Sequence, residues 1–279
     1  MTTDPATWEF PITDPLATAD GPRLPGRVAV VAGGGLSGPE GGVGFGMAWL
    51  YHRNGAAVAV LDRDEAAASR TVAGIRAAGG EAEGFVVDIT DDADVARTVD
   101  AVVARFGRID VVADSVGGAG IEGIFETSVE AWDFAMELNL KSAWYLLRHA
   151  QRHMSAGAAA VLISSGAAEG RGPGLPYSIA KAALEKFTTG AAATLAPRGI
   201  RVNCVRVGMI WGAFAAKGMG QEQREIRRRN VAMQVEGNSW DIASAALFLS
   251  TDASRWVSGQ ILSVDGGGIA ARNVGQAGA

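Results

Sequence analysis

From Arg27 onward, short apolar runs alternate along the chain with longer segments that have a helical pattern. The apolar runs predict buried strands, which lie at 28–32, 57–61, 85–87, 111–113, 159–163, 202–207 and 261–264. The helical segments between them lie near 43–54, 65–78, 91–106, 130–154, 177–197 and 241–250. Strands that alternate with helices are typical of βαβ units, in which each crossover helix packs on the sheet. The sequence therefore predicts an α/β fold, a doubly wound parallel sheet (Rossmann-like) in three layers α/β/α.

The length of 279 residues is typical of a single domain of this type. Residues 1–26 are rich in proline and predict an extended N-terminal arm, in which Trp8 and Phe10 are expected to pack on another surface, such as a neighbouring subunit. Residues 27–269 predict the domain itself, and residues 270–279 predict a C-terminal tail.

The overall charge and the hydropathy pattern narrow the class of partner. With 25 basic and 30 acidic residues the net charge is −5, which argues against a nucleic acid as the main partner. No apolar run approaches the ~20 residues that a membrane-spanning helix needs. The N-terminus lacks the basic and apolar regions of a secretory signal, and the single cysteine, Cys204, cannot form an internal disulfide. We therefore expect a cytoplasmic protein that acts on a small molecule.

Tyr177 and Lys181 are four residues apart in a segment of helical pattern, so their side chains are expected to share one helix face. A free tyrosine has a pKa of about 10, which is too high for proton transfer near neutral pH. A cation one helical turn away favours the phenolate and makes a tyrosine a usable general acid or base. The same spacing occurs often on ordinary amphipathic helices, so the pair alone does not decide the function.

A glycine-rich stretch from Gly33 to Gly46 follows the first expected strand and leads into the first expected helix. Glycines at such a position let the backbone approach a pyrophosphate, which binds the free amide groups at a helix N-terminus. Many glycine-rich loops are only turns, but the place between a strand and a helix favours a dinucleotide site.

Two acidic residues follow the second and third expected strands. Asp62 is placed to accept hydrogen bonds from the ribose hydroxyl groups of an adenosine, and it would repel a 2′-phosphate. It therefore favours NAD over NADP, although Arg63 beside it is of the type that pairs with a 2′-phosphate. Asp88 is placed to contact the adenine. Either aspartate is also suited to cap the helix that follows it.

From about Arg27 to Gly268 the chain resembles the short-chain dehydrogenases/reductases, in their compact single-domain branch. The resemblance rests on motifs in a fixed order rather than on one pattern. These are the glycine-rich stretch, Asp62, Val87-Asp88-Ile89, Asn139-Leu140-Lys141, Ile163-Ser164-Ser165, Tyr177 with Lys181, Gly199-Ile200-Arg201-Val202-Asn203, Ser258-Gly259-Gln260 and Val264-Asp265-Gly266-Gly267. It implies an oxidoreductase that interconverts a secondary alcohol and its ketone.

The resemblance implies a catalytic set of Asn139, a serine, Tyr177 and Lys181. Tyr177 would exchange a proton with the substrate oxygen, while hydride passes to or from the nicotinamide. Lys181 would bind the nicotinamide ribose, and the serine would hydrogen-bond the substrate oxygen. Asn139 would anchor a water molecule that links Lys181 to solvent. Strand register favours Ser165 as the serine, which is our prediction, whereas the usual interval to the tyrosine favours Ser164.

The resemblance also implies a nicotinamide cofactor, with NAD favoured over NADP. The residues expected to bind it are Gly33, Gly42, Val43, Gly44, Asp62, Arg63, Asp88, Ile89, Ser115, Gly117, Tyr177, Lys181, Val207, Gly208 and Ile210. No metal is expected, because His149 and His153 share a helix face without a carboxylate or cysteine in a ligand pattern.

Several positions depart from the family pattern. The glycine-rich stretch has about five extra residues around 36–40, which must bulge outward if 42–44 faces the phosphates. Asp114-Ser115-Val116-Gly117 stands where Asn-Asn-Ala-Gly is usual, and its aspartate would add charge beside the adenosine pocket. Val207-Gly208 replaces Pro-Gly, and Gly212 replaces a threonine that often contacts the cofactor. These departures leave open a non-redox isomerase or dehydratase, and a catalytically silent nucleotide-binding protein.

In this family the segment after the sixth strand covers the substrate, and here that segment is 209–237. Its candidate apolar walls are Trp211, Phe214, Met219 and Met233. A basic group at Arg224, Arg227, Arg228 and Arg229 would bind an anionic substrate, or it forms a solvated helix face. The helix that carries His149 resembles one that forms subunit contacts, so we expect a homodimer or homotetramer.

Overall fold

The computed structural model describes residues 23–39, 41–118, 123, 125–170, 174–216 and 219–268. Trp8 and Phe10 of the expected N-terminal arm, and the expected tail at 270–279, lie outside the described residues.

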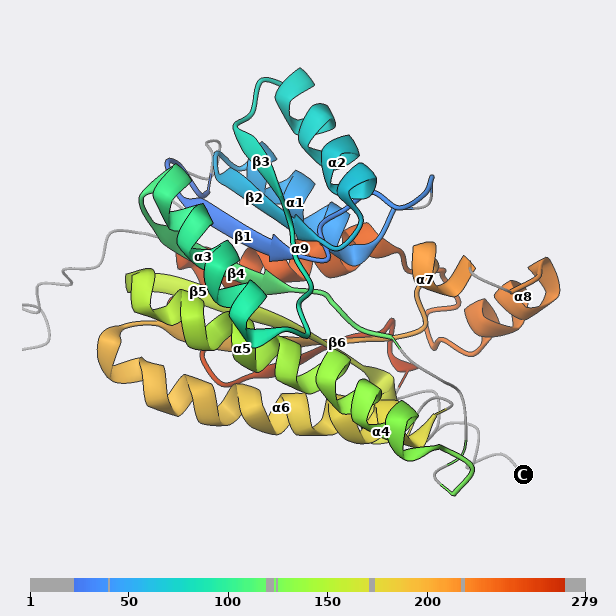
Figure 1. Cartoon of the computed structure of the whole chain (residues 1–279). Coiled ribbons are helices and arrows are strands. Elements are labelled where there is room, and N and C mark those ends of the chain that lie inside the picture. Colours follow the sequence, from blue (N-terminus) through green and yellow to red (C-terminus); the bar gives the residue numbers. More distant parts are fainter. Residues whose placement is uncertain are drawn as a thin grey trace, which may run out of the picture.

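One sheet of seven parallel strands runs through the described part of the molecule (Figure 1). Its spatial order is β3-β2-β1-β4-β5-β6-β7, which confirms the doubly wound arrangement. The strands are β1 (Val28–Ala32), β2 (Ala57–Asp62), β3 (Ala82–Val86), β4 (Ile109–Asp114), β5 (Met154–Ser165), β6 (Arg201–Val207) and β7 (Ile261–Val264). Because the order reverses beside β1, the carboxyl ends of β1 and β4 form the switch point of the sheet.

Helices cover both faces of the sheet, as the alternating pattern predicts (Figure 1). One face packs against α1 (Val43–Arg53), α2 (Glu65–Ala77) and α9 (Ser239–Ser250). The other packs against α3 (Asp92–Phe106), α5 (Ser142–Ala150) and α6 (Leu175–Leu195). The shorter helices α4 (Val129–Met136), α7 (Ala213–Ala216) and α8 (Gln221–Arg229) lie toward the carboxyl ends of the strands (Figure 1). No helix in the described ranges is long and apolar enough to cross a membrane.

The helical segment expected over 130–154 is not one continuous helix. Between α4 and α5 lies a π-helical turn (Glu137–Lys141), and a short 3₁₀ turn (Gln151–His153) follows α5. Asn139 explains the π-helical turn, because its Nδ2 donates to the carbonyl oxygen of Ala135 at 2.9 Å. That oxygen is the one an α-helical amide at this position would use. Such turns occur frequently at functional sites.

The edge strand β3 begins earlier than the apolar run at 85–87 predicts. Glu83 lies within the strand and accepts a hydrogen bond from Nε of Arg105 on α3 at 2.7 Å. Because β3 is at the edge of the sheet and only partly buried, polar side chains are tolerated there. The apolar run therefore marks only the last part of the strand.

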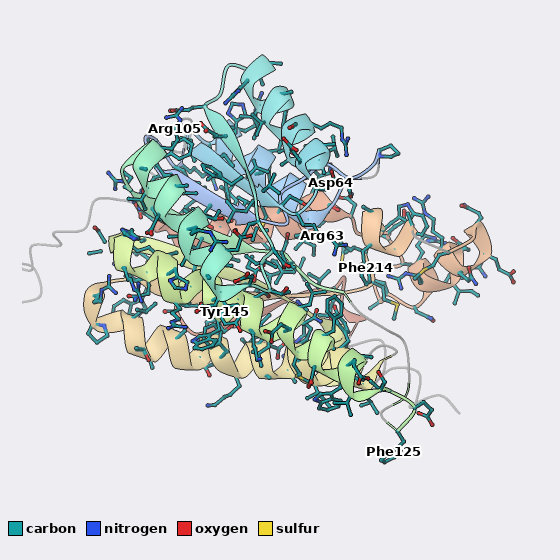
Figure 2. The ribbon with its side chains drawn as sticks, viewed as in Figure 1. Arg63, Asp64, Arg105, Phe125, Tyr145 and Phe214 are labelled. Carbon is teal, nitrogen blue, oxygen red and sulfur yellow. The ribbon has the colours of Figure 1, made fainter. Side chains whose placement is uncertain are left out.

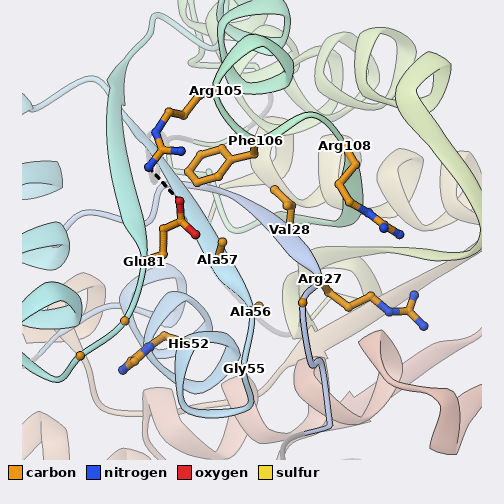
Figure 3. A pocket seen from close by; sticks show the side chains of 13 residues that line it. Arg27, Val28, His52, Gly55, Ala56, Ala57, Glu81, Arg105, Phe106 and Arg108 are labelled. Carbon is orange, nitrogen blue, oxygen red and sulfur yellow. Dashed lines mark hydrogen bonds and ion pairs between the residues drawn. The ribbon is translucent and has the colours of Figure 1, made fainter.

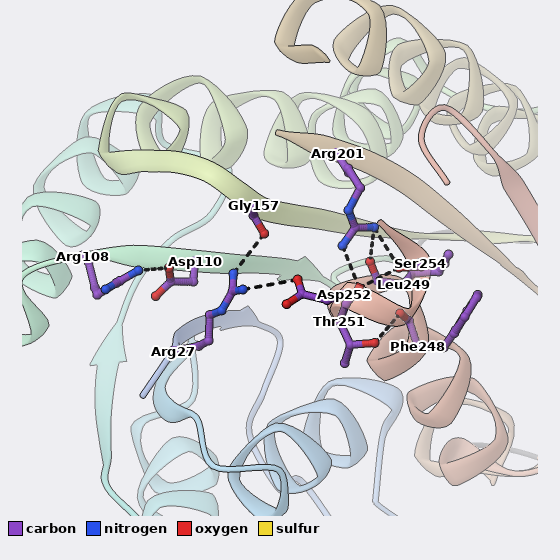
Figure 4. A network of polar contacts seen from close by, with 10 residues as sticks. All are labelled: Arg27, Arg108, Asp110, Gly157, Arg201, Phe248, Leu249, Thr251, Asp252 and Ser254. Atoms are coloured by element: carbon purple, nitrogen blue, oxygen red, sulfur yellow. Dashed lines mark hydrogen bonds and ion pairs between the residues drawn. The ribbon is translucent and has the colours of Figure 1, made fainter. Parts of the chain in front are cut away.

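A buried cation fixes β6 to α9 at the end of the sheet away from the switch point (Figure 4). The guanidinium of Arg201 donates to the carbonyl oxygens of Leu249 at 2.7 Å and Thr251 at 3.1 Å, and to Oγ of Ser254 at 2.8 Å. These carbonyl groups lie at the C-terminus of α9, where a positive charge is favourable. The contact is structural, and it joins the sheet to the helix layer that contains α9.

Candidate active site

The loops after β1 and β4 meet at the switch point, which is the usual place for a ligand in a sheet of this kind. Oγ of Ser115, directly after β4, donates to the carbonyl oxygen of Ala32 at 2.9 Å. Ser115 and Gly33, both expected to bind the cofactor, are therefore neighbours. A Cβ atom at Gly33, whose φ is +70°, would lie 2.9 Å from the Ser115 hydroxyl oxygen.

The N-terminus of α1 packs directly against this loop. A Cβ atom at Gly44 would lie 2.1 Å from the carbonyl oxygen of Gly33 and 2.4 Å from Oγ of Ser115. No other residue fits at position 44 without moving the backbone. The glycine thus brings the amides of the helix close to the end of the sheet.

The first turn of α1 is suited to hold a pyrophosphate. Gly42 is its N-cap and makes no side-chain capping bond, and the turn that begins at Val43 contains no acidic residue. A Cβ atom at Gly42 would meet no heavy atom within 4 Å, so this end of the helix is open. Unsatisfied amides at the positive end of a helix dipole attract an anion. The residues present therefore fit a dinucleotide cofactor.

The extra residues of the glycine-rich stretch are anchored at both sides. The amide of Leu36 donates to the carbonyl oxygen of Ala67 on α2 at 3.0 Å, and Nε of Arg70 donates to the carbonyl oxygen of Leu36 at 2.7 Å. The carbonyl oxygen of Gly41 accepts the amide of Ala213, the first residue of α7, at 3.0 Å. The glycine-rich stretch is thus joined both to α2 and to the segment expected to cover the substrate.

Asp62 lies at the end of β2 with its carboxylate held by two amides. Oδ2 accepts from the amide of Gly35 at 2.9 Å, and Oδ1 accepts from the amide of Asp64 at 3.0 Å. The N-cap of α2 is Asp64, whose side chain accepts two amide hydrogens, so Asp62 does not cap that helix. Arg63 is exposed beside it, on the same side of the molecule as Phe214 (Figure 2).

Asp88 and Ile89 follow β3 and differ in exposure. Asp88 is exposed, and the hydroxyl and amide of Thr90 donate to its carboxylate, which lowers the pKa of Asp88. The N-cap of α3 is Asp91, so Asp88 does not cap that helix either. Ile89 is buried, and its side chain packs in the core. Only its backbone is therefore available to a cofactor.

Tyr177 and Lys181 lie together on the first turns of α6, as their spacing predicts. Nζ of Lys181 is 6.0 Å from the centroid of the Tyr177 ring. Lys181 is only 3% exposed. Its ammonium donates to the carbonyl oxygen of Ile163, near the end of β5, at 2.9 Å. It also donates to the carbonyl oxygen of Val116, just after β4, at 3.2 Å. The ammonium group of Lys181 is thus fixed between the carboxyl ends of β4 and β5.

Asn139 and Gly117 complete the polar group around the lysine. A Cβ atom at Gly117 would lie 2.9 Å from Nζ of Lys181 and 3.0 Å from Oδ1 of Asn139. The Asn139 amide donates to the carbonyl oxygens of Gly118 and Ala135, and its Oδ1 accepts the amide of Gly118 at 3.0 Å. One acceptor position on Oδ1 remains for a water molecule.

The two candidate serines face different partners. Ser164 is 2% exposed, and its hydroxyl donates to Oε1 of Glu185 on α6 at 2.8 Å. The same carboxylate binds Arg206 of β6 through Nε at 2.8 Å and Nη2 at 2.6 Å. Ser165 is half-buried, and its Oγ accepts the amide of Ala167 at 3.2 Å. Sequence reasoning missed Glu185 and Arg206, because nothing local in the sequence relates them to Ser164.

Val207 is the last residue of β6, where it pairs with Val264 of β7, and Gly208 and Ile210 follow it. The amide of Gly208 donates to the carbonyl oxygen of Val264 at 3.0 Å. A Cβ atom at Gly212 would lie 2.8 Å from Oγ of Ser239 at the start of α9. The usual threonine would not fit there unless Ser239 moved, which accounts for the glycine.

The segment at 209–237 is held together by its own charged residues. Among its described residues, 209–216 and 219–237, ion pairs join Arg224 to Glu236 at 2.5 Å, Arg228 to Glu225 at 2.7 Å and Arg229 to Glu225 at 2.9 Å. Arg227 donates instead to the carbonyl oxygen of Ile210 at 3.2 Å. Phe214 lies over the site, since a Cβ atom at Gly118 would be 3.9 Å from its ring. The basic group therefore has structural partners within the segment.

The two histidines considered as metal ligands serve helix packing instead. Nε2 of His149 lies 2.7 Å from Oδ1 of Asp92, which joins α5 to α3. Nε2 of His153 lies 3.9 Å from Oδ1 of Asp100, which is also on α3. Within the ranges that the structure describes, no group of three His, Cys, Asp or Glu side chains is arranged to hold a metal ion.

A depression of about 440 Å³ lies at the opposite end of the sheet, by the amino ends of β1 and β2 (Figure 3). Its three arginines are already in ion pairs, which are Arg105 with Glu81, Arg108 with Asp110 and Arg27 with Asp252. Because the candidate catalytic residues are at the carboxyl ends of the strands, this depression is separate from the candidate site.

An open helix N-terminus and a group of a tyrosine, a buried lysine and a buried asparagine are typical of a nucleotide-dependent α/β enzyme, and comparison with known proteins narrows the class. A family model described as enoyl-(acyl carrier protein) reductase matches residues 38–268. Momilactone A synthase of Oryza sativa subsp. japonica is 36% identical over 262 residues, covering 90% of this chain and 92% of the relative. The 7alpha-hydroxysteroid dehydrogenase of Escherichia coli K12 is 31% identical, covering 90% and 97%.

A solved structure agrees with this likeness. A short-chain dehydrogenase from Burkholderia cenocepacia J2315, in complex with NADP, is 29% identical and superposes with a TM-score of 0.81. The match covers 88% of this chain and 99% of that one. The chain belongs to the short-chain dehydrogenase/reductase family, and it is an oxidoreductase that uses a nicotinamide cofactor.

Proposed function

We propose that the protein interconverts a secondary alcohol and its ketone in the cytoplasm, with NAD(H) as its cofactor. The observation that carries the proposal is the placement of Lys181 between the ends of β4 and β5, 6.0 Å from the Tyr177 ring and next to Asn139. The name of the Escherichia coli hydroxysteroid relative supports an alcohol on a ring as the substrate class.

The proposed roles follow from the partners of each side chain. Tyr177 exchanges a proton with the substrate oxygen, and the buried ammonium of Lys181 favours its anionic form. Ser165 donates a hydrogen bond to the substrate oxygen. Ser164 is unsuited to this role because its hydroxyl already donates a hydrogen bond to Glu185. Asn139 holds a water molecule beside Lys181. The cofactor, when bound, supplies or accepts the hydride.

The preference for NAD is argued from Asp62. Its carboxylate is fixed by the amides of Gly35 and Asp64 at the end of β2, where an adenosine ribose would lie. A fixed negative charge there opposes a 2′-phosphate, whereas ribose hydroxyl groups can donate to it. Arg63 is exposed and is the residue that would favour NADP, the cofactor of the Burkholderia cenocepacia structure.

The proposal is tested by NAD⁺ reduction with cyclohexanol, 2-butanol and a 7α-hydroxysteroid as substrates. We expect turnover of at least one of them, and the Tyr177→Phe variant should lose about 10²- to 10⁴-fold in kcat. Ser164→Ala serves as the control for Ser165→Ala, and only the latter should lose most of the activity. Full activity of Tyr177→Phe would refute the mechanism.

We further propose that the chain forms a homodimer or homotetramer. Trp144 on α5 is 42% exposed and Trp256, just before β7, is 93% exposed. Large exposed aromatic side chains are typical of contact surfaces. Sedimentation velocity at micromolar concentration should show two or four chains per particle, and a strictly monomeric protein would contradict the proposal.

A further inference from the structure

A buried carboxylate lies behind the catalytic group, at a position where the resemblance implies an asparagine. Asp114 is the last residue of β4 and is 4% exposed. Its Oδ1 accepts the amide hydrogen of Val116 at 2.9 Å. Among the described residues it has no ion pair within 4.0 Å, so its charge is not directly neutralised.

The backbone of one residue, Val116, connects Asp114 to Lys181. The amide of Val116 donates to Asp114, and the carbonyl oxygen of Val116 accepts from Nζ of Lys181 at 3.2 Å. The neighbouring strands contribute only apolar residues in register with Asp114, which are Ala32 of β1 and Leu162 of β5. From α6 the charged group that acts on Asp114 is Lys181 itself.

The carboxylate is unfavourable for the stability of the fold. Burial raises the pKa of Asp114 to about 6, although the Val116 amide and the Lys181 charge partly oppose this rise. An asparagine would accept the same hydrogen bond from Val116 without burying a charge. The hydrogen bond therefore does not explain why an aspartate is present, and its charge needs another explanation. Buried groups of this kind are concentrated at functional sites.

We propose that Asp114 is a positioning residue that acts through Lys181, and that its negative charge sets the pH at which Tyr177 exchanges its proton. When Asp114 is ionised, it offsets part of the positive field of Lys181. The anionic form of Tyr177 is then less favoured, so proton transfer requires a higher pH than it would beside a neutral amide. This inference rests on the proposed role of Tyr177.

The first test compares the pH dependence of kcat/KM for alcohol oxidation in the wild type and in Asp114→Asn, with the best alcohol of the panel above. The variant keeps the acceptor for Val116, so we expect the same profile moved to lower pH by roughly half a unit to one unit. Asp110→Asn is the matched control. Asp110 is on the same strand and also 4% exposed, but it binds Arg108 and the amide of Val28 at the other end.

A profile of Asp114→Asn that superposes on the wild type, or that moves to higher pH, would overturn the inference. An equal shift in Asp110→Asn would do the same, because the effect would then follow from any buried aspartate of β4.

A second test does not need a substrate and so separates this inference from the proposed function. The chain has three tyrosines. Burial raises the pKa of Tyr51, and burial together with the Glu137 carboxylate raises the pKa of Tyr145. In an ultraviolet titration, the tyrosinate step that Tyr177→Phe abolishes is assigned to Tyr177.

The pH midpoint of that step reports the electrostatic field at Tyr177 directly. We expect it at lower pH in Asp114→Asn and at an unchanged pH in Asp110→Asn. If the wild type oxidises no alcohol but the step moves, the proposed function fails and the inference stands. If the step does not move in a folded Asp114→Asn protein, the inference fails whatever the activity.

Discussion

At the scale of single residues, the candidate site consists of polar side chains that are oriented by backbone groups. Lys181 is held by two carbonyl oxygens, Asn139 by the backbone of Gly118 and Ala135, and Asp62 by two amides. Because these partners belong to the backbone, they fix the side chains without help from one another. The arrangement favours a site that is formed before the ligands bind.

Asp114 also gives a prediction on stability. Because its folded-state pKa is about 6 and its ordinary value is 3.8, the native state holds its proton over a pH range in which the unfolded chain has lost it. The stability that protonation contributes is present below pH 3.8 and is lost as the pH rises through about 6. At pH 8, Asp114→Asn should therefore be more stable than the wild type by about 1–3 kcal/mol.

Urea unfolding at pH 4.5 and pH 8 measures this difference. The advantage of Asp114→Asn should be smaller at pH 4.5 than at pH 8. A stability advantage of Asp114→Asn that is equal at both pH values, or a variant that is less stable than the wild type at pH 8, would contradict the prediction. The negative charge of Asp114 would then be better neutralised than its contacts indicate.

At the scale of helices and strands, close approach decides what α1 can tolerate. Gly44→Ala would place its Cβ atom 2.1 Å from the carbonyl oxygen of Gly33, so the helix must move away from the loop. We expect a loss of about 1–3 kcal/mol in the free energy of unfolding, together with weaker NADH binding. Thermal unfolding and NADH fluorescence titration measure the two effects.

Gly190→Ala is the matched control for this change. Gly190 lies inside α6 and is exposed, and a Cβ atom there would meet no heavy atom within 4 Å. Alanine should therefore stabilise the protein by about 0.5–1 kcal/mol and leave cofactor binding unchanged. If Gly44→Ala and Gly190→Ala changed stability and NADH binding in the same way, the steric argument for Gly44 would be wrong.

The elements themselves were largely predictable, because buried strands and amphipathic helices differ in the period of their apolar residues. The break at Asn139 was not, since it depends on a side chain that takes the carbonyl group of Ala135 from the backbone ladder. The early start of β3 was missed for a similar reason. Its Glu83 is bound by Arg105, a residue of another element.

The candidate site was predictable to the extent that its residues form ordered motifs along the chain. Spacing alone does not decide between Ser164 and Ser165. The contact of Ser164 with Glu185 of α6, which supports our proposal of Ser165, could not be predicted from the sequence. The aspartate at 114 was expected to add charge beside the adenosine. In the structure the charge that acts on it is that of Lys181.

At the scale of the whole molecule, the described fold brings four segments that are distant in sequence to the carboxyl ends of the strands. The glycine-rich stretch, the end of β4, the π-helical turn and the start of α6 meet there, and 209–237 adjoins the glycine-rich stretch through Gly41 and Ala213. A cofactor bound across this edge would contact several of these segments. Its binding should therefore stabilise the whole domain rather than one loop.

Calorimetric titration of the wild-type protein with NADH and, separately, with NADPH tests the central claim most directly. We predict that NADH binds at least about tenfold more tightly, a difference of about 1.4 kcal/mol, and that Asp62→Asn narrows the gap. Tighter binding of NADPH would mean that Arg63 decides the specificity. Binding of neither nucleotide would contradict the account of a nicotinamide-dependent oxidoreductase.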